Sequence, residues 1–374
     1  MSSKWVLPRI ILEDEYPNSN IPKPLLATLI RRGFTTNEKI NEYFYPPKLP
    51  RLEEHFPQLG KAIKRLNIAC LNKEKIAICG DYDADGMTST ILITEVLKKL
   101  EANVFILIPD RMNEGYGLNE NMINLLSKQD VKLIITVDNG VSATKALKVA
   151  SKLNIDVILS DHHKIPEKLE DVYALIHPET SPKDSPYKYL AGVGLSYVLA
   201  KCLSDSFHNK SLLENSLDYF CIGTIADMSE LKGANRYLLK KGLPHLCQTK
   251  SKGLLKLQYN AGLKNREITS QDISFKLAPR INSVGRIADP NIIINLMLEN
   301  DQNIIDNYAI SCEEINKKRK EICRNIELEA FDLLSNINSD EKSFIILFGK
   351  NWHSGVIGIV ASRIVEKFGR PTAV

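Results

Sequence analysis

The chain of 374 residues is long enough to form two domains or slightly more. Hydrophobic residues make up 44% of it and charged residues 25%, which excludes a largely disordered chain and is typical of a globular protein. The formal net charge of +4 is too small to indicate, by itself, a strongly basic nucleic-acid-binding domain.

We expect neither a signal peptide nor a membrane partner. No run of about 18 apolar residues predicts a membrane-spanning helix, and residues 1–20 lack the basic and apolar pattern of a signal peptide. The seven cysteines are scattered without a C-x-x-C pair, which predicts reduced thiols in a cytoplasmic protein.

The first 70 residues contain short amphipathic pieces broken by prolines and predict a helical N-terminal region of uncertain boundary. From Lys75 the pattern becomes regular, because apolar runs alternate with segments of helical spacing. Strands that are apolar throughout are typical of a parallel sheet covered by helices on both faces, so we predict an α/β fold. The predicted strands are 75–80, 103–108, 132–137 and 155–160, and the predicted helices are 87–100, 118–129 and 141–154.

The second half of the chain is predicted to be mainly helical, with helices over residues 190–203 and 217–228. The spacing of apolar residues over 301–337 predicts one long helix of roughly 50 Å. A strand at 342–349, a glycine-rich turn and a helix over 355–369 are expected to follow. Because a helix of this length often connects domains, we expect a smaller α/β unit after it.

Acidic residues follow every predicted strand of the sheet. Because ligands of open parallel sheets bind at the carboxyl ends of the strands, this placement predicts a site at that edge. The residues, in strand order, are Asp81, Asp83 and Asp85, then Asp110, then Asp138, and then Asp161 with His162 and His163.

The segment DYDADG (81–86) places three carboxylates at alternate positions of a tight turn. Burying like charges this close together costs several kcal/mol, roughly, unless a cation compensates them. Gly86 allows a turn that a larger residue would hinder. The alternative is a solvated acidic turn or a helix N-cap, where aspartate is also favoured.

The other acidic positions are less specific when each is taken alone. Asp138 could be a turn residue before Asn139 and Gly140, and Asp227, at the end of a predicted helix, could be an ordinary helix-terminal residue. The pair of histidines after Asp161 could lie in a surface loop, but neutral imidazole is a frequent metal ligand. Together these groups supply the oxygen and nitrogen ligands that suit Mn²⁺, with Mg²⁺ as the competitor, and an aspartate bridging two ions is used in phosphoester hydrolysis.

The segments DYDADG, TVDNG (136–140), DHH (161–163) and GTIADM (223–228) resemble, in order, the motifs of the DHH phosphoesterase superfamily. Four further segments resemble its RecJ family in particular, and the resemblance runs from about residue 70 to the last residue. These segments are PDRMNEGYGL (109–118), LAGVGLSY (190–197), APRINSVGR (278–286) and HSGVIGIVASR (353–363).

The resemblance implies two metal ions, Mn²⁺ or Mg²⁺, that share Asp138 as a bridging ligand. Asp83 and Asp138, with Asp81, are expected to hold one ion, and Asp85, Asp138, His162 and Asp227 the other. His163 is expected to contact the scissile phosphate or the leaving group. Asp161 is expected to orient an imidazole through a hydrogen bond.

Several arginines and a glycine-rich segment at the start of a predicted helix are the expected contacts to phosphate. Arginine matches phosphate oxygens with a planar fork of donors, and backbone N–H groups at a helix start can receive a phosphate. The alternatives are surface salt bridges and close packing of glycines. Tyr116 could stack on a base or pack in the core, and the basic run 317–320 is given no role in the site. The predicted phosphate or nucleic-acid contacts are Arg111, Arg280, Asn282 and Arg286, the last three around a turn at Gly285, together with His353, Ser362 and Arg363.

The resemblance implies a 5′→3′ exonuclease that releases 5′-mononucleotides from single-stranded DNA in repair and recombination. It also implies a monomer whose partners are single-strand-binding protein and a helicase. The alternatives are a DHH phosphodiesterase acting on short oligonucleotides or cyclic dinucleotides, and a non-catalytic or impaired truncated relative. The expected domains are a helical region (1–70), a DHH catalytic domain (71–245), a linker with the long helix (246–340) and an incomplete DHHA1-type domain (341–374), without the OB-fold usual in such proteins.

Overall fold

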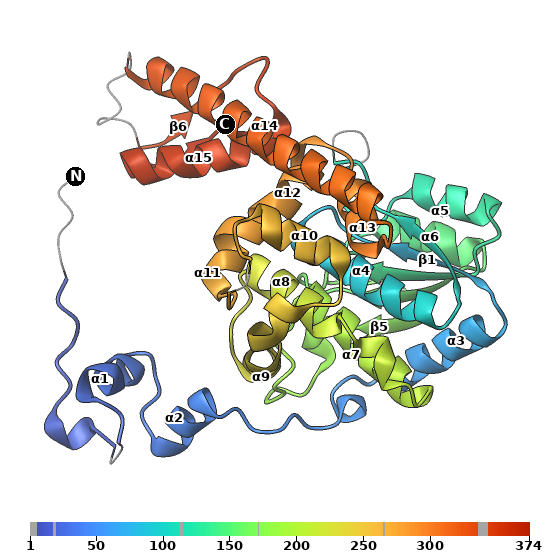
Figure 1. Cartoon of the computed structure of the whole chain (residues 1–374), viewed down its shortest axis with the longest axis horizontal. Helices are drawn as coiled ribbons and strands as arrows, with labels where there is room; N and C mark the ends of the chain where they lie inside the picture. The colour runs from blue at the N-terminus through green and yellow to red at the C-terminus, as the bar shows by residue number, and fades with distance from the viewer. Residues whose placement is uncertain (1–5, 18–19, 112–114, 171, 265, 336–342) are drawn as a thin grey trace.

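The computed structural model describes residues 6–17, 20–111, 115–170, 172–264, 266–335 and 343–374. Its main body is an α/β unit built on one parallel sheet, from which the N-terminal helices and the C-terminal module extend (Figure 1). No helix in these described ranges is long and apolar enough to cross a membrane.

The sheet has five parallel strands in the order β2-β1-β3-β4-β5. The four predicted strands are confirmed, and the order changes direction beside β1. A fifth strand was not predicted, because three apolar residues between loops give too short a pattern. The strands are β1 (Lys75–Cys79), β2 (Asn103–Leu107), β3 (Leu133–Val137), β4 (Asp156–Ser160) and β5 (Ala174–Ile176).

Helices cover both faces of the sheet, as the apolar strands predicted. Side chains that alternate along each strand point to opposite faces, so Ile76 and Ile78 enter one core whereas Ala77 and Cys79 enter the other. The first core is formed with α4 (Ala84–Lys99), α7 (Gly192–Ser206) and α8 (Ser216–Ala226). The second is formed with α5 (Glu120–Lys128) and α6 (Thr144–Lys152).

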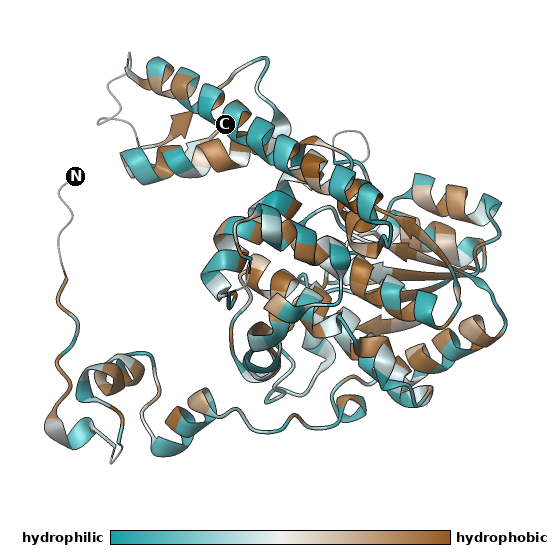
Figure 2. Ribbon diagram, in the orientation of Figure 1, coloured by the Kyte–Doolittle hydropathy of each residue, from teal (hydrophilic) through white to brown (hydrophobic). Residues whose placement is uncertain are grey.

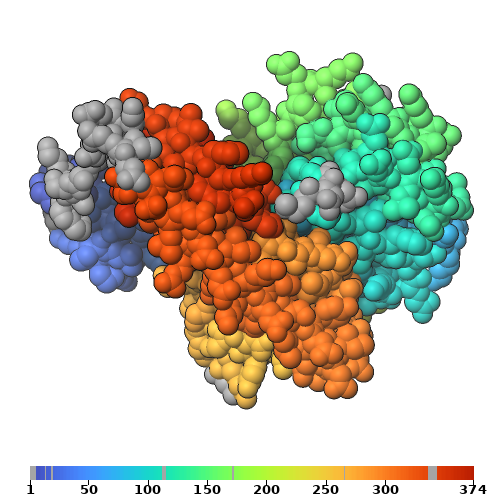
Figure 3. Space-filling model, turned by 90° about the horizontal axis from the view of Figure 1, so that it is seen from above, coloured from blue at the N-terminus to red at the C-terminus, as the bar shows by residue number. Residues whose placement is uncertain are grey.

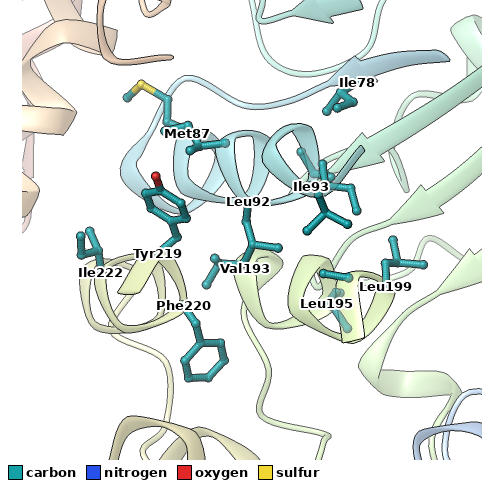
Figure 4. Close-up of a cluster of buried hydrophobic side chains, with 14 of the residues drawn as sticks. Ile78, Met87, Leu92, Ile93, Val193, Leu195, Leu199, Tyr219, Phe220 and Ile222 are labelled. Carbon is teal, nitrogen blue, oxygen red and sulfur yellow. The ribbon is translucent and has the colours of Figure 1, made fainter. Parts of the chain in front are cut away.

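The central helix of the first core is α4, which is buried along most of its length. Figure 4 shows Leu92 of α4 directed toward Val193 of α7, and the ring of Tyr219 of α8 directed toward the start of α4. Fixing α4 between the sheet and these two helices also fixes its first turn, where two of the predicted metal ligands lie.

The N-terminal residues form a small unit with its own apolar cluster, outside the main body (Figures 1 and 2). It contains α1 (Lys23–Arg31) and α2 (Asn37–Phe44). Arg236 and Lys240 of the main body donate to the backbone carbonyls of Tyr43 and Phe44, at the C-terminal end of α2. In contrast, α3 (Leu59–Leu71) packs into the core of the main body.

A group of helices connects the sheet unit to the C-terminal module: α9 (Gly233–Gly242), α10 (Lys252–Asn260), α11 (Ser270–Asp272), α12 (Ala278–Ile287) and α13 (Asn291–Leu298). A π-helical turn (Ile273–Leu277) precedes α12. The prediction that the APRINSVGR segment surrounds a turn at Gly285 was wrong, since the segment forms α12. Gly285 serves close packing instead, because a Cβ there would lie 1.8 Å from the carbonyl oxygen of Tyr82.

The predicted long helix is confirmed as α14 (Gln302–Ser335), with 34 residues. It runs from the main body to a small module that contains β6 (Ile345–Ile346), α15 (Ser354–Phe368) and β7 (Thr372–Ala373), with β6 and β7 parallel (Figure 1). The strand expected at 342–349 is shorter than predicted, and residue 342 lies outside the described residues. Short 3-10 turns lie at Glu13–Glu15, Leu52–Glu54, Pro178–Thr180, Lys210–Leu213 and Leu243–Gln248.

Candidate metal centre and phosphate-binding residues

The predicted metal ligands converge at the carboxyl ends of β1, β3 and β4. Asp138 directly follows β3, and His162 lies two residues after β4, while Asp227 caps the C-terminal end of α8. The ligand atoms form three overlapping groups, in each of which they lie within 4.8 Å of one another. The groups are Asp81, Asp83 and Asp138; Asp85, His162 and Asp227; and Asp138, His162 and His163.

Asp83 and Asp85, at the start of α4, accept hydrogen bonds from different helices and therefore point in different directions. Asp83 is the N-cap of α4, and its carboxylate accepts a hydrogen bond of 3.0 Å from the backbone N–H of Gly86. Asp85 points across to the first turn of α7, where it accepts hydrogen bonds of 2.7 and 2.8 Å from the N–H groups of Gly192 and Val193. The N-terminal end of α7 thereby stabilises a buried carboxylate.

Asp138 belongs to the group of Asp81 and Asp83, and it also lies close to His162, which belongs to the group of Asp85 and Asp227. Its Oδ1 atom is 3.0 Å from Nε2 of His162, which is in turn 3.8 Å from Oδ2 of Asp85. The backbone of Asp138 has a φ of 63°, in the left-handed region that is uncommon for residues other than glycine. Such a conformation costs about 1–3 kcal/mol and is typical of functional sites.

Burial and mutual repulsion make these carboxylates hard to ionise without a counter-charge. Burial, followed by the charge of Asp83, raises the pKa of Asp81 to about 7. Burial also raises the pKa of Asp85, with the charge of Asp227 adding to it, and that of Asp138, with the charge of Asp85 adding to it. The pKa of His162 is lowered by burial, which favours the neutral imidazole that a metal ligand must be.

Divalent cations fit this donor set. Oδ1 of Asp81 and Oδ1 of Asp138 are buried without a hydrogen-bond partner, since the contact of His162 with Asp138 is short but poorly directed. Unpaired buried oxygens of this kind are costly unless a cation satisfies them. Carboxylate oxygens with one imidazole nitrogen suit Mn²⁺ or Mg²⁺.

Asp161 organises the loop that carries the two histidines. It is buried and accepts hydrogen bonds from the backbone N–H groups of Val141, His162 and His163, and from Nδ1 of the His163 ring at 2.8 Å. This contact matches the predicted orienting role. The hydrogen bond from Asp161 raises the pKa of His163, whose side chain is 49% exposed.

A further histidine, His177, supports this loop from outside it and was not predicted. His177 is fully buried, and its Nε2 atom is 2.8 Å from the carbonyl oxygen of His163, while its Nδ1 atom accepts from the N–H of Glu179. Both ring nitrogens are therefore satisfied in the neutral state. The sequence signal was weak, because a single histidine after the unpredicted strand β5 carries no spacing pattern.

Two of the predicted phosphate contacts lie beside the predicted metal ligands. The guanidinium of Arg111 lies 5.1 Å from the centre of the Tyr82 ring, and Arg286 donates to the carbonyl oxygen of Gly355 at 3.1 Å. Both arginines line a pocket of about 560 Å³, together with Asp110, Asp289 and neighbouring residues. Tyr116 also lies at this edge, where its hydroxyl donates to the carbonyl oxygen of Asp138 at 3.1 Å.

The other predicted phosphate contacts have protein partners. Arg280 pairs with Glu313, and Arg363 with Glu327. The side-chain oxygen of Asn282 accepts a hydrogen bond of 2.7 Å from the N–H of Ala84. His353 caps α15, where its Nδ1 atom accepts from the N–H of Gly355, and the Ser362 hydroxyl donates to the carbonyl oxygen of Gly358. A phosphate role for these five residues stays a prediction.

Comparison with known proteins places this arrangement in a family. The DHH family, N-terminal domain, matches residues 75–224. RecJ, the single-stranded-DNA-specific exonuclease of Bacillus subtilis, is 37% identical over 354 residues, which is 94% of this chain. The chain is a RecJ-type member of the DHH family. RecJ of Haemophilus influenzae is 32% identical over 97% of this chain.

Solved RecJ structures have the same fold as this RecJ-type chain. A crystal structure of exonuclease RecJ bound to manganese matches with a TM-score of 0.78 and 29% identity, over 86% of this chain and 81% of that one. RecJ of Thermus thermophilus in complex with Mn²⁺ matches with a TM-score of 0.79 and 26% identity, over 96% of this chain and 54% of that one. The RecJ-type chain spans 44% of the B. subtilis relative and 65% of the H. influenzae relative.

Proposed function

We propose that this RecJ-type chain hydrolyses phosphodiester bonds of single-stranded DNA from the 5′ end and releases 5′-mononucleotides. The observation that carries the proposal is the chain of three overlapping ligand groups, in which Asp138 belongs to two groups and His162 joins the third to them. The relatives that match most of this chain are named as single-strand-specific exonucleases, and solved relatives contain Mn²⁺ or Mg²⁺.

We assign the two metal positions as the resemblance implies. Asp81, Asp83 and Asp138 would hold one ion, and Asp85, Asp138, His162 and Asp227 the other, an assignment supported by two of the three ligand groups. Two bound divalent cations would lower the pKa of a water molecule and neutralise charge on the phosphate.

The remaining chemistry comes from residues around the carboxylates. Nδ1 of His163 is bonded to Asp161, so Nε2 is the atom that can donate to the phosphate or to the leaving oxygen. The hydrogen bond to Asp161 raises the pKa of the His163 imidazole, which favours the protonated, donating form. Arg111 and Arg286, beside the same carboxylates, would orient a phosphate through their forked donors.

A labelled-strand assay tests this function. A 5′-phosphorylated single strand, labelled at either end, is incubated with Mn²⁺, with Mg²⁺ or with a chelator, beside a duplex and a dinucleotide. We expect mononucleotides from the 5′ label first, no reaction with the chelator, and slow attack on the duplex. Release of the 3′ label first would contradict the polarity, and cleavage of the dinucleotide alone would favour a phosphodiesterase of short oligonucleotides.

The remaining features implied by the resemblance are proposals of the same standing. They comprise single-strand-binding protein and a helicase as partners, the monomeric state, the cytoplasmic location and the bounds of the four expected domains. The start of the catalytic domain is the exception: α3 (Leu59–Leu71) packs in the main core, so we propose that this domain begins before residue 70.

A further inference from the structure

Three arginines near the metal ligands have only neutral partners. Arg111 lies over the Tyr82 ring, Arg286 donates to a backbone carbonyl, and the guanidinium of Arg319 donates to the side-chain oxygen of Asn316 at 2.8 Å. Within the described ranges of the chain, no ion pair joins any of these three groups to a carboxylate. Each arginine is thus held in position while its charge stays available.

Arg319 lies on the same face of α14 as two buried residues. It follows the buried Asn316 by three positions and precedes the buried Cys323 by four, so all three share one face of the helix. That face packs against α12, which carries Arg286. The neighbouring Lys317, Lys318 and Lys320 are exposed. The basic run therefore divides into three solvated lysines and one inward-facing, half-buried arginine.

The electrostatics of Arg286 support this proximity. Burial first, and then the charges of Arg111 and Arg319, lower the pKa of Arg286, whereas the nearby charge of Asp83 raises it. Arg111 and Arg319 are therefore both close enough to Arg286 to act on its charge. Figure 3 shows the C-terminal module, in orange and red, on the side of the main body where teal residues are exposed.

Uncompensated cations at one place favour an anion there. Three guanidinium groups repel one another, and an anion with several oxygens relieves the repulsion through forked, charge-assisted hydrogen bonds. The contrast with Arg280 and Arg363 is informative, because the charges of those two are already balanced by Glu313 and Glu327.

We propose that Arg319 contacts a phosphate group of the nucleic acid and acts together with Arg111 and Arg286. This inference rests on the proposed function for the identity of the ligand, and it adds to the site a residue that its sequence context did not indicate. The phosphate could be the 5′-terminal group or an internal phosphodiester, which have the same anionic oxygens.

The test is equilibrium binding of the full chain to a fluorescent single-stranded oligonucleotide, without divalent cations so that no cleavage occurs. We expect R319Q to weaken binding about tenfold, as for a lost charge-assisted contact. It should also reduce the dependence of log K on log salt by about 0.7, the contribution of one phosphate contact on a single strand. K318Q removes the same charge one position away and should change binding less than about twofold. R319K should keep the salt dependence but restore only part of the affinity.

Two oligonucleotides, one with a 5′-phosphate and one with a 5′-hydroxyl, locate the contact. If R319Q weakens binding of both oligonucleotides, Arg319 contacts an internal phosphate. If it weakens binding of the 5′-phosphorylated oligonucleotide alone, Arg319 contacts the terminal phosphate. Wild-type affinity of R319Q for both, or equal losses in R319Q and K318Q, would overturn the proposal. Thermal unfolding verifies that the variants are folded. If the wild-type chain binds the oligonucleotide but does not hydrolyse it after metal is added, the proposed function is contradicted. The phosphate contact of Arg319 would still stand, because the binding assay tests it separately.

Discussion

Asp138 occupies a position that tolerates little displacement. Its backbone is held in the left-handed region, where its N–H donates to the carbonyl oxygen of Ser160, and its side chain lies against the start of α7. A Cβ added at Gly192 would lie 2.5 Å from Cβ of Asp138 and 2.7 Å from its Oδ1 atom. Gly192 is therefore a packing requirement of the proposed bridging ligand.

We predict that G192A reduces nuclease activity about a hundredfold, because a displacement on the order of 1 Å at a catalytic group has this effect. Metal affinity, measured by calorimetry, should fall as well. G60A is the matched control, since a Cβ there meets nothing within 4 Å. If G192A keeps the metal affinity of the wild type, the position of the Asp138 carboxylate is not critical for metal binding.

Asp218 is a buried carboxyl outside the metal site, and burial raises its pKa to about 6. Because this folded-state pKa lies above the ordinary value of 3.8, the neutral form stabilises the fold. That contribution is complete below about pH 4 and is lost as the pH rises through about 6.

We predict that D218N removes this part of the pH dependence. Between pH 4 and pH 8 the wild-type chain should lose about 2–3 kcal/mol relative to the variant, from roughly two pKa units at about 1.4 kcal/mol each. Urea unfolding of both proteins at the two pH values measures the difference. If the unfolding free energies of the wild type and D218N change equally with pH, Asp218 does not contribute this pH dependence.

The candidate ligands other than Asp227 could be predicted from the sequence because they follow apolar strands, and strands of a parallel sheet end at a common edge. Asp227 follows a helix, and only the family resemblance indicated it. The supporting contacts could not. Asn282 was predicted only as a phosphate contact and His177 was not predicted at all, because their hydrogen bonds join segments far apart in the chain that only the packing of α12 and β5 brings together.

At the scale of elements, α12 supports the turn that carries the metal ligands. Gly285 lets α12 approach the backbone of Tyr82, and Asn282 accepts a hydrogen bond from the N–H of Ala84, the first residue of α4. The segment was predicted to surround a turn because it contains asparagine and glycine. Its proline lies in the first turn of the helix, where proline is tolerated, and its glycine serves tertiary packing.

We predict that N282A lowers stability by about 1 kcal/mol through the lost hydrogen bond and lowers kcat more than it raises KM. N282D keeps the acceptor oxygen and should recover most of kcat, with its steady-state kinetics compared at equal metal concentration. If Asn282 instead contacts phosphate directly, the added charge of N282D should raise KM beyond that of N282A.

At the scale of the whole molecule, the C-terminal module contacts the main body at Arg286, one of the two arginines beside the candidate metal site. Arg286 of α12 donates to the carbonyl of Gly355 at the start of α15, and a Cβ at Gly355 would lie 2.1 Å from the carbonyl oxygen of Arg286. The length of α14 and the order of the motifs predicted two connected units. Their mutual placement depends on such individual contacts, which no periodic pattern encodes.

The central claim is that this molecule holds two divalent cations through one shared aspartate. Titration of Mn²⁺ into the metal-free chain by calorimetry tests it most directly. We predict two bound ions for the wild type, an unchanged titration for D130A, which removes an exposed turn carboxylate, and weakened binding of both ions for D138A. Wild-type binding by D138A, or no binding by the wild type, would contradict the account.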